Sequence, residues 1–162
     1  MISTRVFPLA SLLLSAAIFG FFYAWVCSTM WGLDAAGPAV AIEAMQAMNA
    51  SVRNAVFFPA FFLTPAVLAV TAALLMRTGR RGAAIWFALA AGVYATGGFG
   101  VTVLVNVPMN QALAQVVVPD ATEAAGEIWR SYSERWQLWN QVRAMASGLA
   151  VLLTGIGLLR IS

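Results

Sequence analysis

The side chains in this sequence that are suited to chemistry are amides, arginines and indoles, since the chain has no histidine and a single cysteine, Cys27. Without histidine, a zinc hydrolase site, a histidine-ligated haem and a catalytic triad built on histidine are all excluded. One cysteine permits no internal disulfide and no redox pair. The remaining groups can donate hydrogen bonds to an anion, to a ligand oxygen or to one another.

The clearest pattern of such residues lies just before the last apolar segment. Aromatic residues and one arginine recur there at the intervals that share one face of a helix, namely Trp129, Tyr132, Trp136, Trp139 and Arg143. The uncharged run after Arg143 predicts that its guanidinium lies at or just inside a membrane surface, where it needs an anion or several acceptors. Two alternatives stay open: Arg143 snorkels to the lipid headgroups, and the tryptophans form an aromatic belt at the membrane interface.

Amide side chains gather near the same boundary, together with a second arginine. The sequence places them at the ends of apolar segments, as Asn49, Arg53, Asn106, Asn110 and Asn140. If these groups meet Arg143, they can supply it with acceptors or, together with it, surround a ligand oxygen. We therefore predict a polar pocket at one rim of a helical bundle, with Trp136 and Tyr132 on its inner side.

The elements that carry these residues are predicted to cross a membrane. The chain is 62% hydrophobic and only 9% charged, a composition that excludes a disordered chain, a nucleic-acid-binding protein and an ordinary soluble enzyme. A bilayer core needs about 20 apolar residues in a helix, and the sequence holds four such runs, at about residues 6–33, 55–76, 82–105 and 140–160. We predict an all-α integral membrane protein, a four-helix bundle formed by residues 1–162 as a single domain.

Helical extensions are expected to form a cap over one end of this bundle, from about residues 39–54 and 106–139. Ile42, Met45 and Met48 recur at helical spacing, which predicts an amphipathic helix. If this helix runs straight on into the second span, the two form one rod that is longer than the bilayer is thick. The last span is likewise expected to project outward as one long helix, with residues 106–114 crossing between the two. The inner surface of this cap is the expected place for the pocket.

The placement of arginines predicts the orientation in the membrane. Five arginines and no acid lie on the side that holds both termini and the loop between the second and third spans, namely Arg5, Arg77, Arg80, Arg81 and Arg160. The other side holds four arginines and all six carboxylates. Both termini are therefore expected in the cytoplasm, with the cap on the periplasmic or outer side of what we expect to be a bacterial inner membrane.

Small residues predict where helices pack closely. They recur every four residues on the first span, as Ala16, Gly20, Ala24 and Ser28, and on the last span, as Ala144 and Gly148. Such stripes let backbones approach one another within a membrane, and they are also compatible with self-association into a homo-oligomer. Three glycines late in the third span are interpreted as packing positions in preference to ligand access, namely Gly97, Gly98 and Gly100.

Three segments give the sequence a resemblance to a known family. AMQAMN at residues 44–49, FGVTVLVNVPMNQALA at residues 99–114 and WRSYSERWQLWNQVR at residues 129–143 resemble the anthrone oxygenase-like family of small four-helix membrane proteins. The resemblance implies a monooxygenase that converts anthrones to anthraquinones with molecular oxygen and needs no metal or flavin, so no cofactor is expected. One position departs from the pattern: many relatives have histidine after the Trp-Asn pair, where this chain has Gln141.

The positions that match the family are Asn49, Asn106, Asn110, Trp136, Asn140 and Arg143, and the chemistry of such an oxygenase suggests roles for them and for nearby residues. Arg143 and Asn140 would act as catalytic groups that stabilise an enolate oxygen, and Glu43, the one carboxylate of its amphipathic segment, is the candidate base. The expected substrate-binding residues are Trp136, Tyr132, Asn49, Asn106, Asn110 and Arg53. Glu123 and Glu127 stand one turn apart, but without histidine they do not make the ligand set of a di-iron bundle, and no metal is expected.

A non-catalytic role is the alternative. In it, the same polar cluster holds the cap together, and the bundle binds a lipid, a quinone or a protein partner. Under both interpretations the chain lies in a membrane, its small-molecule ligand is hydrophobic or a lipid, and no nucleic acid is bound. The interpretations differ in a measurable respect, because replacing Arg143 abolishes turnover in the first and mainly lowers stability in the second.

Overall fold

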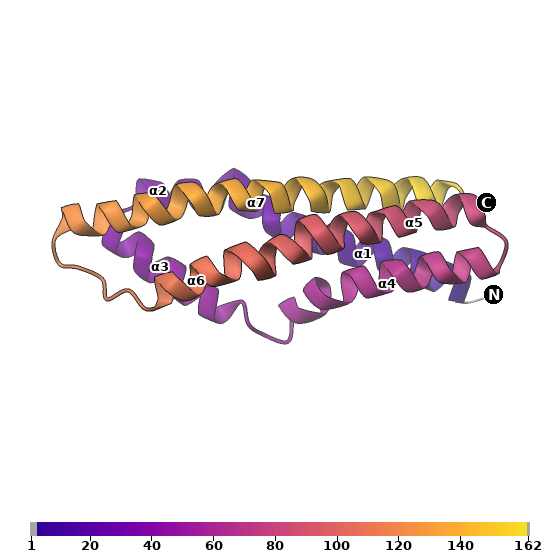
Figure 1. Ribbon diagram of the computed structural model, residues 1–162, viewed down its shortest axis with the longest axis horizontal. Coiled ribbons are helices and arrows are strands. Elements are labelled where there is room, and N and C mark those ends of the chain that lie inside the picture. Colours follow the sequence, from indigo (N-terminus) through magenta and orange to yellow (C-terminus); the bar gives the residue numbers. More distant parts are fainter. Residues whose placement is uncertain (1–2, 162) are drawn as a thin grey trace.

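The computed structural model describes residues 3–161, and every element in this range is a helix. Four helical rods are long and apolar enough to cross a membrane, namely Val6–Ala35, Phe57–Arg77, Arg81–Ala114 and Thr122–Leu159. Figure 1 shows the rods lying along one common axis. The prediction of an all-α protein with four membrane-spanning helices is confirmed, and the chain is an integral membrane protein.

Two of the rods contain π-helical turns, which widen a helix and are common at functional sites. The first rod consists of α1 (Ser3–Ala24), the π-helical η1 (Trp25–Thr29) and α2 (Met30–Ala35). The third consists of α5 (Arg81–Val93), the π-helical η2 (Tyr94–Gly100) and η3 (Thr102–Asn106), and α6 (Val107–Ala114). η1 and η3 lie toward the ends of their rods where the polar residues gather, whereas η2 lies in the middle of the third rod.

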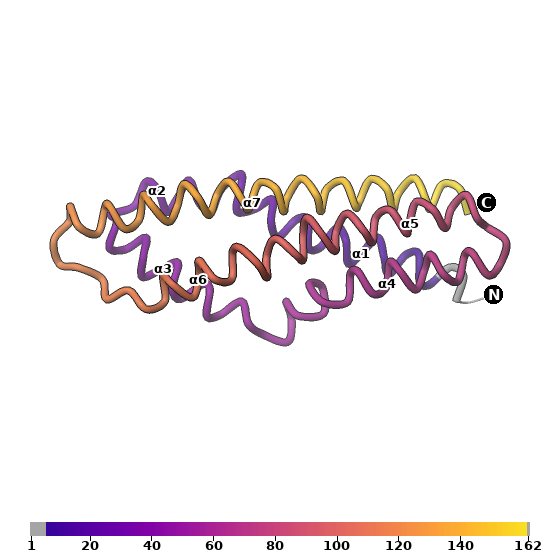
Figure 2. The backbone as a smooth tube through the Cα atoms, in the orientation of Figure 1, coloured from indigo at the N-terminus to yellow at the C-terminus, as the bar shows by residue number. Residues whose placement is uncertain are grey.

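Residues 106–114 do not cross between helices as predicted. They continue the third rod as α6, and Figure 2 shows the backbone from α5 to α6 as one unbroken path. Pro108 is compatible with this continuity because it lies at the start of α6, directly after η3, and local π-helical adjustment accommodates proline within a membrane helix. The third rod therefore reaches into the cap itself.

The second predicted rod is interrupted, which is a further difference from the sequence-based expectation. Helix α3 (Pro38–Ser51) ends before a non-helical link, and α4 (Phe57–Arg77) begins after it. The side chain of Asn54 stabilises this link: its Oδ1 accepts hydrogen bonds from the backbone N–H groups of Val56 at 2.9 Å and Phe57 at 3.0 Å. Asparagine competes with helical backbone pairing in this way, so the chain turns where an uninterrupted helix was expected.

The cap consists of α2, α3, α6 and the first half of α7 (Thr122–Leu159). Helix α7 has 38 residues and is about 57 Å long at the rise of an α-helix, nearly twice the thickness of a bilayer core. The cap has an apolar core of its own, formed by Met30, Ala41, Ile42, Met45, Leu113, Ala125, Trp129, Tyr132 and Trp136. Packing of these side chains fixes the outer half of α7 against the other cap helices.

The glycines of η2 serve close packing, as predicted. A Cβ atom added to Gly97 would lie 2.5 Å from the Cβ of Ala146, and one added to Gly98 would lie 2.7 Å from the ring of Tyr94. On α7, Ala144 is buried and Gly148 faces the ring of Phe19. Helix α7 thus approaches its neighbours at small residues, which is how helices gain contact in a membrane.

The stripe of small residues on α1 does not take part in this packing, so that part of the prediction is wrong. All four of its members are exposed, namely Ala16, Gly20, Ala24 and Ser28. The opposite face of α1 enters the bundle instead, because it carries the larger apolar side chains of Ile18 and Phe22, which are 1% exposed. Burying these side chains fixes the rotation of α1 about its axis.

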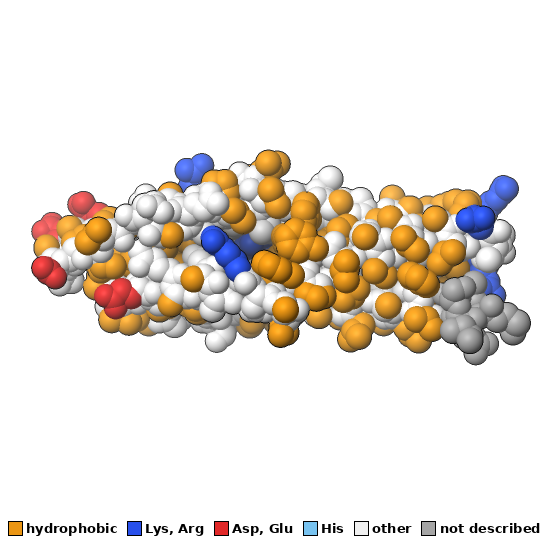
Figure 3. Space-filling view, turned by 90° about the horizontal axis from the view of Figure 1, so that it is seen from below, with side chains coloured by type: hydrophobic (Ala, Val, Ile, Leu, Met, Phe, Trp, Pro, Cys, Tyr) orange, Lys and Arg blue, Asp and Glu red, His pale blue; other side chains and the backbone are white. Residues whose placement is uncertain are grey.

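Acidic and basic side chains gather at opposite ends of the rods. Figure 3 shows acidic side chains at one end of one face and arginines at the opposite end, with apolar side chains and further arginines between them. The arginines of the turn between α4 and α5, Arg77, Arg80 and Arg81, are all exposed. The side chain of Arg5, which entered the orientation prediction, lies outside the described part of the structure.

Candidate functional site

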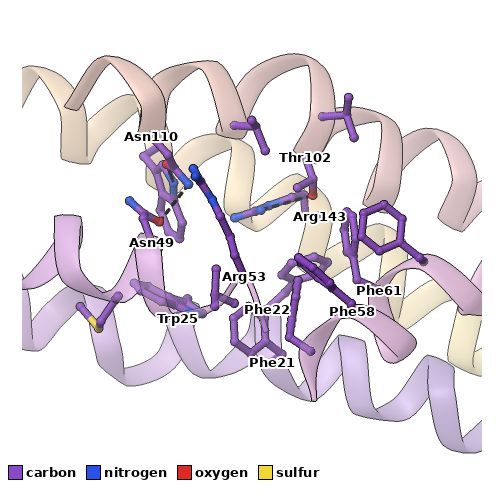
Figure 4. Close-up of a pocket in the computed structure, with 17 residues that line it drawn as sticks. Phe21, Phe22, Trp25, Asn49, Arg53, Phe58, Phe61, Thr102, Asn110 and Arg143 are labelled. Atoms are coloured by element: carbon purple, nitrogen blue, oxygen red, sulfur yellow. Dashed lines mark hydrogen bonds between the residues drawn. The ribbon is translucent and has the colours of Figure 1, made fainter. Parts of the chain in front are cut away.

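A cavity of about 270 Å³ lies at the base of the cap, where all four rods contribute to its lining. Six phenylalanines and two tryptophans form most of its wall, namely Phe21, Phe22, Phe57, Phe58, Phe61, Phe62, Trp25 and Trp136. Its polar lining comes from Asn49, Arg53, Thr102, Asn110 and Arg143. Figure 4 shows the amides at one end of the cavity and the phenylalanines of α4 at the other.

Arg143 reaches the cavity from within the bundle. Its side chain is 5% exposed, and its guanidinium donates hydrogen bonds to the Oγ1 of Thr102 at 3.3 Å and the Oδ1 of Asn140 at 2.8 Å. The guanidinium carbon also lies 4.6 Å from the ring centre of Phe22 and 5.1 Å from that of Trp136. Ring faces attract a cation in this geometry, and the snorkelling alternative is wrong because the head group is buried.

The guanidinium of Arg143 has a hydrogen-bond donor that is not used within the described residues. Its Nε atom is buried and has no hydrogen-bond partner among the described residues. No carboxylate within residues 3–161 forms an ion pair with it; its contacts are neutral oxygens and rings. A buried cation without a counterion is costly, so this end of the cavity favours an anionic or strongly polar ligand.

Asn140 stands behind Arg143 and does not line the cavity. It is 1% exposed, and its Nδ2 donates to the backbone carbonyl of Phe22 at 3.2 Å while its Oδ1 accepts from Arg143. The amide therefore links α1 to α7 and fixes the direction of the guanidinium. The structure supports a positioning role for Asn140 in place of direct contact with a ligand.

Asn110 is the centre of a hydrogen-bonded cluster at the end of the cavity that lies opposite the phenylalanines of α4. Its Oδ1 accepts from the hydroxyl of Tyr132 at 2.8 Å and the Nε1 of Trp136 at 2.9 Å. Its Nδ2 donates to the Oδ1 of Asn49 at 2.9 Å. The cluster joins α3, α6 and α7, and three of its members line the cavity, whereas Tyr132 lies behind them.

Asn106 is near the site but separate from the cavity lining. It is fully buried, and neither its Oδ1 nor its Nδ2 has a hydrogen-bond partner in the described part of the chain. It follows Thr102 by about one turn of the π-helical η3, so both residues lie on a similar face of the third rod. An unpaired buried amide costs about 1–3 kcal/mol, and water is the ordinary partner for such a group.

Of the two remaining predicted residues, Arg53 lines the cavity and Glu43 does not. Arg53 is exposed, and its side chain extends over the cavity toward Asn110 (Figure 4). Glu43 is exposed on the outer face of α3 and does not line the cavity. The opposite face of α3 carries Ile42 and Met45, whose burial in the cap core turns Glu43 outward. The structure thus does not bring Glu43 to the site as a base.

The aromatic wall on α4 was missed by the sequence analysis. Phe57, Phe58, Phe61 and Phe62 stand in two pairs four residues apart, which is a helical spacing. Phe57 and Phe61 stack with ring centres 5.4 Å apart, and Phe61 stacks on Phe99 at 5.1 Å. This spacing indicated that the four phenylalanines share a side of the helix. In an apolar span, however, such a side fits contact with lipid as well as it fits a cavity wall.

Asp34 is a second feature that the sequence analysis missed. Its Oδ1 accepts hydrogen bonds from the Nε1 of Trp129 at 3.0 Å and the Oγ of Ser133 at 2.7 Å, and its Oδ2 accepts from the Nε2 of Gln137 at 2.8 Å. These bonds attach α2 to α7 across the cap. Trp129 is buried in the cap core, so the aromatic-belt alternative is wrong for this residue.

Fold and site together define a class of protein: an integral membrane helical bundle with an aromatic cavity that contains a buried arginine. The family model of anthrone oxygenase matches residues 47–153, which is more than half of the chain, and this protein belongs to the anthrone oxygenase family. Searches of curated proteins and of solved structures gave no match. Within residues 3–161, no cluster of three or more acidic, cysteine or histidine residues could hold a metal ion.

Proposed function

We propose that this protein is a membrane-embedded oxygenase that oxidises a planar, hydrophobic phenol of the anthrone type with molecular oxygen. The proposal depends on one observation. The guanidinium of Arg143 is buried beside a cavity walled by aromatic rings, and it has no carboxylate partner among the described residues. Membership of the anthrone oxygenase family supports the same substrate class and the same reaction.

The cavity suits a flat aromatic ligand. Its volume of about 270 Å³ lies close to the lower end of the range for small-molecule sites, roughly 300–1,000 Å³. The rings of Phe57, Phe61 and Trp136 offer faces and edges for stacking, which contributes about 0.5–1.5 kcal/mol per pair beyond burial. A ligand held between these rings would present an oxygen substituent to the polar end of the cavity.

Arg143 would stabilise the ionised substrate. A positive group close to an acidic substrate favours its anion, and a fixed donor in a dry site is more effective than water. Arg53, at the mouth, adds a second positive charge on the route to solvent. Since no carboxylate appears among the residues that line the cavity, we propose that the substrate proton leaves to water at the mouth, and that the site selects the enolate.

The enolate then supplies the electrons for the reaction with oxygen. The carbon of the enolate forms a bond to molecular oxygen. The outer oxygen of the resulting peroxide then takes a proton, which gives a hydroperoxide. Loss of water from this hydroperoxide leaves a carbonyl group in place of the original methylene. The methylene carbon is oxidised and oxygen is reduced, with one oxygen atom retained in the product and the other released as water, so no further reductant is needed.

An oxygen-uptake assay with anthrone tests the proposal. Purified protein in lipid nanodiscs should consume oxygen and form anthraquinone, and Arg143→Ala should lower the rate by about 100-fold or more, the usual loss when a donor to an oxyanion is removed. Arg130→Ala is the matched control, because Arg130 is exposed on the same helix and should leave the rate unchanged. A wild-type protein that forms no anthraquinone contradicts the proposal.

A non-catalytic binding bundle is the second candidate function. It is favoured by the cluster around Asn110, whose hydrogen bonds to Asn49, Tyr132 and Trp136 are complete within the chain and join three cap helices. In that case the protein binds a lipid or quinone without turnover. Arg143→Ala should then lower the melting temperature markedly, and no variant, nor the wild type, should consume oxygen.

We also propose that both termini face the cytoplasm of a bacterial cell and that the cap lies outside the inner membrane. The exposed arginines of the turn between α4 and α5 support this orientation, since positively charged loops remain on the cytoplasmic side. Cysteine introduced at Arg80 should be protected from an impermeant maleimide in whole cells, and cysteine introduced at Asp120 in the cap should be labelled. The reverse pattern overturns the orientation.

A further inference from the structure

A second hollow adjoins the cavity on the side of α1. It has a volume of about 480 Å³ and lies between α1 and the chain that links α3 to α4. Five residues line both hollows, namely Phe21, Trp25, Met48, Val52 and Phe57. The two spaces therefore share a wall of side chains beneath residues 52–57, and this chain segment passes over both.

The second hollow differs from the cavity in its chemistry. Its polar side chains are Ser51 and Asn54, and both are exposed. The amide of Asn54 is already bonded to the backbone of its own link. The rest of its lining is apolar and includes the exposed Ala17, the partly buried Ala60 and the buried Ile18. A charged or polar ligand group would lose its solvation there without compensation, whereas a hydrocarbon chain would not.

Three of the five residues shared by the two hollows are aromatic, namely Phe21, Trp25 and Phe57. The ring centres of Phe21 and Phe57 lie 4.8 Å apart, and those of Trp25 and Trp136 lie 5.1 Å apart. Phe21, Trp25 and Phe57 are each only partly buried. Side chains of this kind change rotamer much faster than helices move, so a ligand can part the rings without rearranging the bundle.

We propose that the site takes an amphiphile: an aromatic or enolic head lies in the cavity against Arg143, and an attached hydrocarbon chain passes between Phe21 and Phe57 into the second hollow. This inference rests on the proposed function only in taking the cavity as the ligand site. The second hollow lies beside the middle of the first rod and the start of α4, and both segments are apolar enough to cross a membrane. A ligand dissolved in the bilayer would reach the site from there with its chain still in an apolar environment.

The position of the ligand's hydrocarbon chain tests the inference better than the binding affinity does. Lipid is as apolar as the hollow, so moving the hydrocarbon chain from lipid into the hollow gains little free energy. Two probes share one head group: orcinol, a resorcinol with a methyl substituent, and a resorcinol with a long saturated chain that carries a diazirine near its middle. Photolysis in nanodiscs should label residues of α1 around Ala17 and Phe21 or the start of α4 at Ala60. Excess orcinol should suppress this labelling, since the heads compete for the cavity.

Paired tryptophan substitutions on α1 supply the control. Ala17→Trp fills the second hollow and should reduce labelling by the long-chain probe about tenfold, while orcinol binding is retained. Ala16→Trp places the same side chain at an adjacent exposed position that lines neither hollow, and it should leave both probes unaffected. If Ala17→Trp fails to fold, Ala60→Phe narrows the same hollow from the other side.

Each remaining outcome overturns the inference in a recognisable way. If orcinol binds but the alkyl chain of the long probe labels other faces of the bundle, the inference of an amphiphilic ligand is wrong and the proposed function stands. If the chain labels the hollow and orcinol does not suppress it, the occupant is an independent lipid chain. If neither orcinol nor anthrone binds, the cavity is not the ligand site, and the proposed function fails together with the inference.

Discussion

At the scale of single residues, the site combines one cation with amides that hold it and its surroundings in place. Arg143 is oriented by Asn140 and Thr102, while Asn110 accepts two hydrogen bonds from α7 and donates one to α3. Both arrangements connect the rods through hydrogen bonds between side chains. The polar groups thus keep the cavity open and also provide its one buried charge.

Replacing Asn110 tests whether its cluster holds the cap together. Asn110→Leu removes the acceptor of Tyr132 and Trp136 and leaves Asn49 without its donor, so we expect the protein to lose about 2 kcal/mol of stability. A thermal melt in detergent measures the loss. Gln111→Ala is the control, because the adjacent Gln111 is exposed and should melt like the wild type. Equal melting temperatures for the two variants would show that the cluster is energetically neutral.

At the scale of elements, the widened third rod is what brings the helices together beside the site. Its π-helical η2 carries glycines against α7, and its η3 carries Thr102 to the guanidinium of Arg143. A π-helical turn shifts the faces of a helix relative to one another. The third rod can therefore present glycines to α7 in the span and Asn110 to the cap along one continuous helix.

Replacing Gly97 tests this contact between rods. The added Cβ of Gly97→Ala would lie 2.5 Å from the Cβ of Ala146, so η2 and α7 must separate, at a cost of about 1–3 kcal/mol. Gly92→Ala on the same rod meets no atom within 4 Å and should be neutral or slightly stabilising. Thermal melts of both variants make the comparison, and Ala146→Gly should restore the stability of Gly97→Ala. If Ala146→Gly does not restore stability, the destabilisation by Gly97→Ala does not arise from the contact with Ala146.

At the scale of the whole molecule, the cap is attached to the bundle by continuous helices and closed by long-range polar contacts. Asp34 joins α2 to α7, and Gln46 on α3 donates to the carbonyl oxygens of Leu113 in α6 and of Val116 just after it. The cap is therefore closed by contacts between segments that lie far apart in the sequence. Its closure determines whether the cavity beneath it persists.

Replacing Asp34 tests how the cap is closed. Asp34→Ala removes the acceptor of Trp129, Ser133 and Gln137, and we expect a loss of about 1 kcal/mol, less than the roughly 1.5–3 kcal/mol of a charged hydrogen bond, because Asp34 is exposed. Hydrogen exchange should accelerate in α2 and the first half of α7 while the spans stay protected. Asp120→Ala removes an exposed acid of the same cap and should change neither region. Faster exchange throughout the molecule would argue against a separate cap closure.

The sequence by itself determined the spans, because hydrophobicity and helical periodicity are local properties that a bilayer reads along the chain. It also indicated Arg143, Asn110 and Asn49 as site residues, since polar groups beside apolar runs are expensive and stand out. It could not show that the link at residues 52–56 breaks the second rod, because the decisive bonds of Asn54 compete with helical pairing on nearly equal terms.

Only the tertiary structure decided which groups meet. Asn49 and Asn110 are separated by 61 residues, and Asn49 and Tyr132 by 83, so their contact depends on the rotation of each rod about its axis. That rotation is set by burial of the largest apolar side chains, which turns Phe22 inward and leaves the small-residue stripe of α1 and Glu43 outside. Periodicity predicts the faces of a helix, whereas packing selects which face looks at which neighbour.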